Sequence, residues 1–167
     1  MPTLTARPID RESFAPYGWL IEAPASQAAT AGRPINGGSS LRIDGLSELA
    51  LNAAGGMPCL SLFVAAPRDP AGPWHEMERH VLGTQTFVPM NGARCVVLVA
   101  GGDSAPDPST LAAFLVSGRQ GITLRPGTWH HGLMALDGGD FVVIERQAAP
   151  VDCEIAQLAE PVRIALG

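Results

Sequence analysis

The chain has 167 residues, of which 46% are hydrophobic and 16% are charged, and its formal net charge at neutral pH is −5. This composition excludes a disordered chain and is typical of a compact domain with a sizeable core, which we expect to span residues 1–167. The acidic groups are scattered and no basic patch is present, so we expect no nucleic acid as a partner.

The three cysteines are odd in number and widely spaced, at Cys59, Cys95 and Cys153. This pattern does not suit a disulfide framework or a zinc-thiolate site. The first residues lack the apolar run of a signal peptide, and no apolar stretch reaches the roughly 18 residues that a membrane-spanning helix needs. We therefore expect a cytoplasmic protein without a membrane partner.

Short strands dominate the elements that the sequence predicts. Asp10 can cap a short helix that ends near Phe14. Residues 24–40 are small and polar, which favours a long loop, and segment 41–51 fits no single element. Strands are expected, in chain order, at 18–23, 59–66, 74–80, 84–90, 93–100, 121–124, 132–136 and 141–147, with another in the C-terminal tail.

A turn and a helix are predicted within this series. Asn91-Gly92 is a dipeptide favoured in two-residue hairpin turns, because both residues tolerate positive φ. The best helix candidate starts at the potential N-cap Asp107 and ends at Gly118. Many short strands with tight turns and a few short helices predict an all-β barrel or sandwich. Glycine-rich phosphate loops are missing from the sequence, so no nucleotide or organic cofactor is expected.

Two histidine clusters are the strongest functional signal. The first, at 74–80, reads WHEMERH. Its His75 and His80 are five residues apart, whereas a zinc-binding helix of the His-Glu-x-x-His type needs a spacing of four, so we reject that interpretation. On a strand, side chains alternate between faces, which places Glu76, Glu78 and His80 on one face.

The second cluster, at 125–132, reads RPGTWHHG. Pro126-Gly127 suits a tight type II turn. On the strand that follows, His130 and His131 point to opposite faces, so at most one of them joins a pocket. All four histidines of the chain lie in these two clusters, which favours a functional site over two unrelated structural positions.

These clusters resemble the two sequence motifs of the cupin superfamily. Glu78 and His80 take the places of the His-x-His pair of the first motif, and Gln85 takes the place of its glutamate. The run GTWH that ends at His130 matches the second motif, with Arg125 where a proline usually lies. The resemblance implies an all-β, jelly-roll-like cupin barrel with a few short helices, in which His130 faces inward.

Longer stretches, HEMERHVLGTQTFVPMNG, WHHGLMALDGGDFVVIER and INGGSSLR, resemble the ureidoglycolate lyase family, whose older name is ureidoglycolate hydrolase. The resemblance runs from about residue 7 to residue 155. It implies cleavage of (S)-ureidoglycolate to glyoxylate and urea in allantoin degradation, by a cytoplasmic homodimer. Two alternatives stay open: an amidohydrolase that releases ammonia from this substrate, and a non-catalytic cupin that binds a small carboxylic acid.

Such a cleavage needs groups that carry protons, and histidine and glutamate are suitable. We expect His80 or His130 to act as the base and Glu78 to transfer a proton or bind a metal. A planar guanidinium can bind the substrate carboxylate through two bonds, which makes Arg42 a candidate clamp. A divalent metal such as nickel, manganese or zinc is left open. The expected catalytic residues are Glu78, His80 and His130; the substrate-binding residues are Arg42, Gln85, Asn36 and Arg125; and the metal ligands, where a metal is used, are Glu78, His80, Gln85 and His130.

Overall fold

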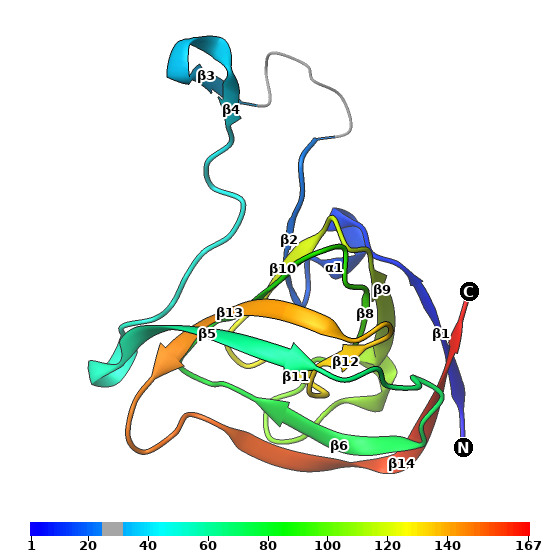
Figure 1. Ribbon diagram of the computed structural model, residues 1–167. Coiled ribbons are helices and arrows are strands. Elements are labelled where there is room, and N and C mark those ends of the chain that lie inside the picture. Colours follow the sequence, from blue (N-terminus) through cyan, green and yellow to red (C-terminus); the bar gives the residue numbers. More distant parts are fainter. Residues whose placement is uncertain (25–31) are drawn as a thin grey trace.

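The computed structural model describes residues 1–24 and 32–167, and strands are their main regular element (Figure 1). The predicted all-β fold is confirmed, and the predicted strands recur with shifts of one or two residues at their ends. None of the helices in the described residues is long and apolar enough to cross a bilayer. The main elements are β1 (Thr3–Pro8), α1 (Arg11–Phe14), β2 (Gly18–Ile21), β3 (Arg33–Ile35), β4 (Ser40–Arg42), β5 (Met57–Ala65), β6 (Trp74–Arg79), β7 (Gln85–Pro89), β8 (Cys95–Ala100), β9 (Ala112–Val116), β10 (Gly121–Leu124), β11 (Trp129–His130), β12 (Met134–Ala135), β13 (Gly139–Gln147) and β14 (Glu154–Leu166).

The described strands form two large sheets and a separate hairpin. The order in the seven-stranded sheet is β11-β6-β14-β1-β9-β8-β12, and the order in the five-stranded sheet is β2-β10-β7-β13-β5. Strand β11 pairs with both β6 and β8, so the strands from β11 to β8 close into a six-stranded barrel. This arrangement is consistent with a cupin-like barrel.

Two hydrophobic cores follow from this arrangement. Every strand of the closed ring contributes to the first core, which fills the barrel and includes Met77 and Trp129. The second core lies between the ring and the five-stranded sheet and includes Phe87, Phe114 and Phe141. Because side chains alternate along a strand, the neighbours of Met77 and Trp129 point away from the barrel interior, toward the second core.

The turn at Asn91-Gly92 has the predicted backbone but a different role. Both residues have positive φ, 54° and 77°. The flanking strands do not pair with each other, because β7 belongs to the five-stranded sheet and β8 to the seven-stranded sheet. The expected hairpin is therefore wrong, and the turn carries the chain from one sheet to the other.

The predicted helix from Asp107 to Gly118 is also wrong. Asp107 does cap a turn, since its Oδ1 accepts a hydrogen bond from the Ser109 backbone N–H at 2.9 Å, but that 3-10 turn covers only Pro108–Thr110. Strand β9 follows and pairs with both β1 and β8. Two hydrogen-bonded neighbours and burial of Phe114 outweigh the modest helix propensity of its alanine and leucine residues.

The loop expected at 24–40 is only partly observed. Residues 25–31 lie outside the described residues, and 33–42 form a hairpin in which β3 pairs antiparallel with β4. This hairpin belongs to a segment at 32–56, here called the arm, which links β2 to β5. Figure 1 shows the hairpin standing well away from the barrel and the five-stranded sheet.

Candidate active site

Glu78, His80 and His130 lie together where β6 and β11 pair. Glu78 and His130 are partners across these antiparallel strands, and Nε2 of His130 lies 3.3 Å from Oε1 of Glu78. His80 follows directly after β6, and its ring centre lies 5.3 Å from that of His130. The structure therefore brings the three residues expected to be catalytic into one cluster, here called the triad.

Hydrogen bonds to the backbone fix both imidazole rings. Nδ1 of His80 lies 2.6 Å from the Asp152 carbonyl oxygen, and Nδ1 of His130 lies 3.1 Å from that of Thr128. A carbonyl oxygen only accepts, so each Nδ1 carries a proton, and in the neutral ring it is Nε2 that has the lone pair. Both Nε2 atoms are buried and have no hydrogen-bond partner among the described residues. Two basic nitrogens are thus held free in the site.

Asp152 holds the turn that follows His80. Its carboxylate accepts hydrogen bonds from the backbone N–H groups of Val81, Leu82 and Gly83, at 2.8, 2.8 and 3.0 Å. The backbone carbonyl of the same residue orients the His80 ring. No sequence pattern indicated this role, because Asp152 lies about seventy positions from the turn and belongs to neither histidine cluster.

Gln85 joins the site through Glu145. The two residues are partners across β7 and β13, and Nε2 of Gln85 donates to Oε2 of Glu145 at 2.9 Å. Glu145 lines the same small cavity as His80. Oε1 of Gln85 is buried without a hydrogen-bond partner in the described part of the chain, so it can accept from a ligand. Glu145 was not expected, because no motif includes it.

Glu78 is held as a carboxylate. The Nε2–H that His130 presents in its protonated form lowers the pKa of Glu78 below the ordinary value of 4.5, against the opposing effect of burial, and the neighbouring His80 acts in the same direction. The Cys153 thiol lies 3.7 Å from Oε2 of Glu78. Burial and the nearby Glu78 charge raise the pKa of this thiol, so Cys153 stays protonated beside the triad at neutral pH.

The other expected substrate-binding residues do not reach the triad of their own chain. Asn36 and Arg42 belong to the projecting hairpin of the arm (Figure 1). The Arg125 guanidinium stacks on the ring of Trp19, 3.8 Å from its centre, and its Nε donates to the Ala15 carbonyl at 3.0 Å. Arg125 is thus engaged with the segment around β2.

The triad has the donor set of a divalent-metal site. One ligand atom from each of its residues can be chosen so that all lie within 4.8 Å of one another. Two imidazole nitrogens without partners among the described residues and an ionised carboxylate oxygen suit nickel, manganese or zinc. Both rings already donate through Nδ1 to the backbone, as metal-binding histidines usually do.

The chain resembles known proteins over almost its whole length. A family model described as ureidoglycolate lyase matches residues 1–165. A ureidoglycolate lyase of Azotobacter vinelandii is 37% identical over 155 residues, which cover 92% of this chain and 91% of the relative. Proteins of the same name from Salmonella typhimurium and Pseudomonas fluorescens are 36% and 32% identical, and the matches cover 93% and 99% of this chain and 94% and 98% of those relatives.

Proposed function

Because the chain belongs to the ureidoglycolate lyase family, we propose that it cleaves (S)-ureidoglycolate to glyoxylate and urea at the triad of Glu78, His80 and His130. The observation that carries the site assignment is the pair of Nε2 atoms, unpartnered among the described residues, beside an ionised carboxylate. The reaction places the enzyme among the carbon-nitrogen lyases of allantoin and purine degradation.

The reaction moves one proton from oxygen to nitrogen. Ureidoglycolate carries a hydroxyl group and a urea nitrogen on the same carbon. When the hydroxyl loses its proton, the oxygen forms the carbonyl of glyoxylate, and the electrons of the breaking carbon-nitrogen bond go to nitrogen. That nitrogen takes up a proton and leaves as urea. Because no proton is gained or lost overall, one basic group can accept the hydroxyl proton and return it to nitrogen.

His130 is placed to carry this proton. Its Nε2 has a free lone pair, and Nδ1 is tied to the Thr128 carbonyl, so the ring is already oriented. When Nε2 takes up the proton, the imidazolium lies in ion-pair contact with Glu78. His80 presents a second free Nε2 toward the same region and can accept a hydrogen bond from the substrate. Gln85 offers Oε1 to the N–H groups of the urea.

A divalent metal fits the triad, with Glu78, His80 and His130 as its ligands, and we propose Gln85, whose Oε1 has no partner among the described residues, as the fourth. A bound metal would hold the hydroxyl and carboxylate oxygens of the substrate and acidify the hydroxyl. Metal binding and proton transfer make different demands on His130, because a ligand nitrogen uses the lone pair that a base must keep free. Removal of metal from the purified protein separates these two roles.

We also propose a single cupin domain that works as a cytoplasmic homodimer. The closed barrel and the match to the cupin motifs support membership of the cupin superfamily. The described cysteines Cys59, Cys95 and Cys153 are free thiols, which suits a reducing compartment. The uncovered apolar surface of β5 supports self-association.

Product analysis tests the proposed function. Purified protein incubated with (S)-ureidoglycolate should release urea and glyoxylate in equal amounts. The amidohydrolase alternative requires ammonia in place of urea, and the relatives named above do not favour it. A protein that binds glyoxylate but leaves ureidoglycolate intact would be a non-catalytic cupin.

A further inference from the structure

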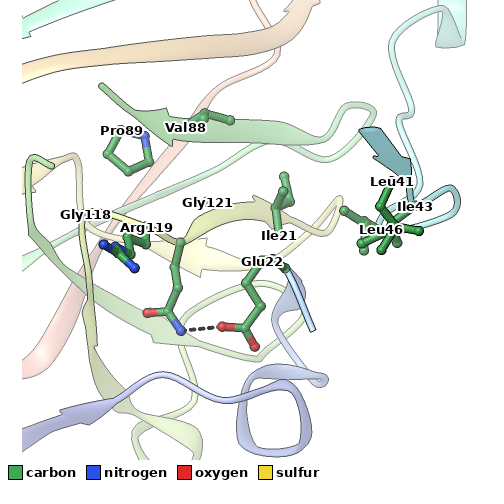
Figure 2. A pocket seen from close by; sticks show the side chains of 12 residues that line it. Ile21, Glu22, Leu41, Ile43, Leu46, Val88, Pro89, Gly118, Arg119 and Gly121 are labelled. Carbon is green, nitrogen blue, oxygen red and sulfur yellow. Dashed lines mark hydrogen bonds between the residues drawn. The ribbon is translucent and has the colours of Figure 1, made fainter. Parts of the chain in front are cut away.

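The arm contacts the rest of its own chain mainly near its C-terminal end, at residues 50–56. Most of its residues from 33 to 49 are exposed, including Leu41 and Leu49, and Figure 1 shows its hairpin projecting into open space. Figure 2 shows Leu41, Ile43 and Leu46 facing Ile21 and Val88 across a pocket of about 400 Å³. This pocket contains no residue of the triad. Leu41 and Leu49 of the arm thus remain partly uncovered by their own chain.

Strand β5 offers an uncovered surface of the same kind. It is nine residues long and forms the edge of the five-stranded sheet. Leu60, Leu62 and Val64 share one face of this strand and are 73%, 54% and 79% exposed. A long apolar edge strand is prone to pair with another chain, and natural proteins usually protect or cover such edges. One chain therefore carries both an uncovered hairpin and an uncovered sheet edge.

The hairpin also carries a pair of arginines. Arg33 and Arg42 are directly opposite each other across β3 and β4, so both side chains leave the hairpin on the same face. Like charges in this position destabilise a hairpin unless an anion neutralises them. Arg42 bonds to Asp44 through Nε and remains 55% exposed, and Arg33 makes no ion pair within the described residues. The pair is suited to binding a carboxylate.

One arginine of the same chain lies close to the triad, because Arg146 lines the small cavity that holds His80 and Glu145. All eleven basic residues of the sequence are arginines, and the substrate is a carboxylate. Two nitrogens of Arg146 already donate to the carbonyls of Ala53 and Ala54, and its Nη1 is buried without a hydrogen-bond partner among the described residues. Most of the other arginines outside the arm are also engaged, with Arg11 bonded to backbone carbonyls, Arg68 stacked on Trp74, Arg79 paired with Glu154, Arg94 paired with Asp137 and Arg125 stacked on Trp19.

We propose that two copies of this chain associate across β5 and exchange their arms, so that Arg33 and Arg42 of one copy bind the substrate carboxylate at the triad of the other. Charge complementarity supports this occupant, because two guanidinium groups from the arm would meet a site whose carboxylates, Glu78, Glu145 and Asp152, have only Arg146 of their own chain beside them in the described cavity. Two-fold symmetry lets both arms and both edges be covered at once. The inference rests on the proposed function for the identity of the carboxylate.

Mixed dimers test whether the arginines act on the partner. The double variant Arg33→Ala/Arg42→Ala has an intact triad, and the His130→Ala variant has an intact arm. Each variant alone should have at least ~10-fold lower kcat/KM. The two chains are co-expressed with different tags, and the mixed dimer is purified through both. The mixed dimer should recover about half of the wild-type activity. One of its two sites then combines the intact triad of one chain with the intact arm of the other.

The proposed exchange of arms would be overturned by a mixed dimer that is as inactive as each variant alone. It would also be overturned by an arginine double variant with wild-type kcat/KM. Arg163→Ala, on the exposed part of β14, is the matched control and should retain wild-type activity. Wild-type protein that produced no urea would instead reject the proposed function, and in that case light scattering still tests the association.

Light scattering tests the proposed association across β5 independently of activity. Wild-type protein should have the mass of two chains, and the double variant Leu60→Glu/Leu62→Glu should have the mass of one. These side chains are exposed, so the substitution leaves both cores intact. Leu166→Glu, at another exposed leucine, should remain dimeric. A wild-type monomer, or a β5 variant that stays dimeric, would contradict the proposal.

Discussion

Glu78 and His130 are partners across β6 and β11, and Nε2 of His130 lies 3.3 Å from Oε1 of Glu78. This pairing joins two sequence clusters that are far apart along the chain. Because the register of the two strands sets the contact, the carboxylate lies beside the imidazole before any substrate arrives. The lowered pKa of Glu78 is the electrostatic consequence of that position.

Loss of any triad residue should disable the enzyme without unfolding it. We expect His130→Ala, His80→Ala and Glu78→Gln each to lower kcat by roughly 100-fold or more, the usual contribution of a positioned proton carrier. Urea release measures kcat, and circular dichroism verifies the fold. His75→Ala is the matched control, since His75 is exposed and bonds to Gln157. A triad variant with near-normal turnover would remove that residue from the mechanism.

Asp152 should affect both stability and catalysis. Asp152→Ala leaves three backbone N–H groups of the turn after His80 without their acceptor, which we expect to cost about 1–3 kcal/mol in the free energy of unfolding. Without this turn the His80 ring is held less firmly. We expect kcat to fall by ~10-fold as a result, because a small displacement of a catalytic group slows the reaction. Chemical denaturation and urea release measure the two effects.

The control for this prediction is Asp107→Ala. Asp107 also accepts a backbone N–H, that of Ser109, but it caps a turn outside the triad. We expect this variant to lose stability and to keep its kcat. Equal losses of kcat in the two variants would show that Asp152 acts only through stability.

The pH dependence of stability should reveal the lowered pKa of Glu78. A carboxyl group whose pKa is lowered by folding stabilises the native state above its unfolded pKa, and that stabilisation is lost as the pH falls through the lower native value. Wild-type protein should therefore lose more stability than Glu78→Gln as the pH falls below 4.5, the ordinary value for the group. Denaturation series at several pH values measure the difference. Parallel curves for the two proteins would show that the pKa of Glu78 is unchanged by folding.

Metal binding can be tested apart from activity. We expect the chelator-treated protein to bind one manganese, nickel or zinc ion per chain in calorimetry, and His130→Ala to bind it at least ~10-fold more weakly because one ligand is lost. If chelation also abolishes urea release and added metal restores it, the triad acts as a metal site. Full activity of the metal-free protein would instead support proton transfer by His130.

Local patterns in the sequence were enough to predict much of the fold. The period of two in WHEMERH correctly separated Glu78 from its buried neighbour Met77, and Asp10 caps α1 as expected, accepting the Ser13 N–H at 2.9 Å. These features depend on nearest neighbours along the chain. Asn91-Gly92 was predicted as a turn for the same reason, but the partners of its flanking strands depend on the whole sheet order.

The parts of the site that were missed depend on distant contacts. Asp152 reaches the triad through a loop between β13 and β14, and Glu145 reaches it as the cross-strand partner of Gln85. Neither residue belongs to a motif with a fixed spacing. The helix expected after Asp107 failed for a related reason, because β1 and β8 pair with that segment from both sides.

Elimination of urea from (S)-ureidoglycolate at the triad is the proposal on which the others depend. Its most direct test is simultaneous quantification of the urea, glyoxylate and ammonia released by the purified wild-type protein and by Glu78→Gln. We expect urea and glyoxylate in equal amounts from the wild type, with no ammonia, and at least ~100-fold slower release from the variant. Release of ammonia in place of urea, or equal rates from the two proteins, would refute the proposal.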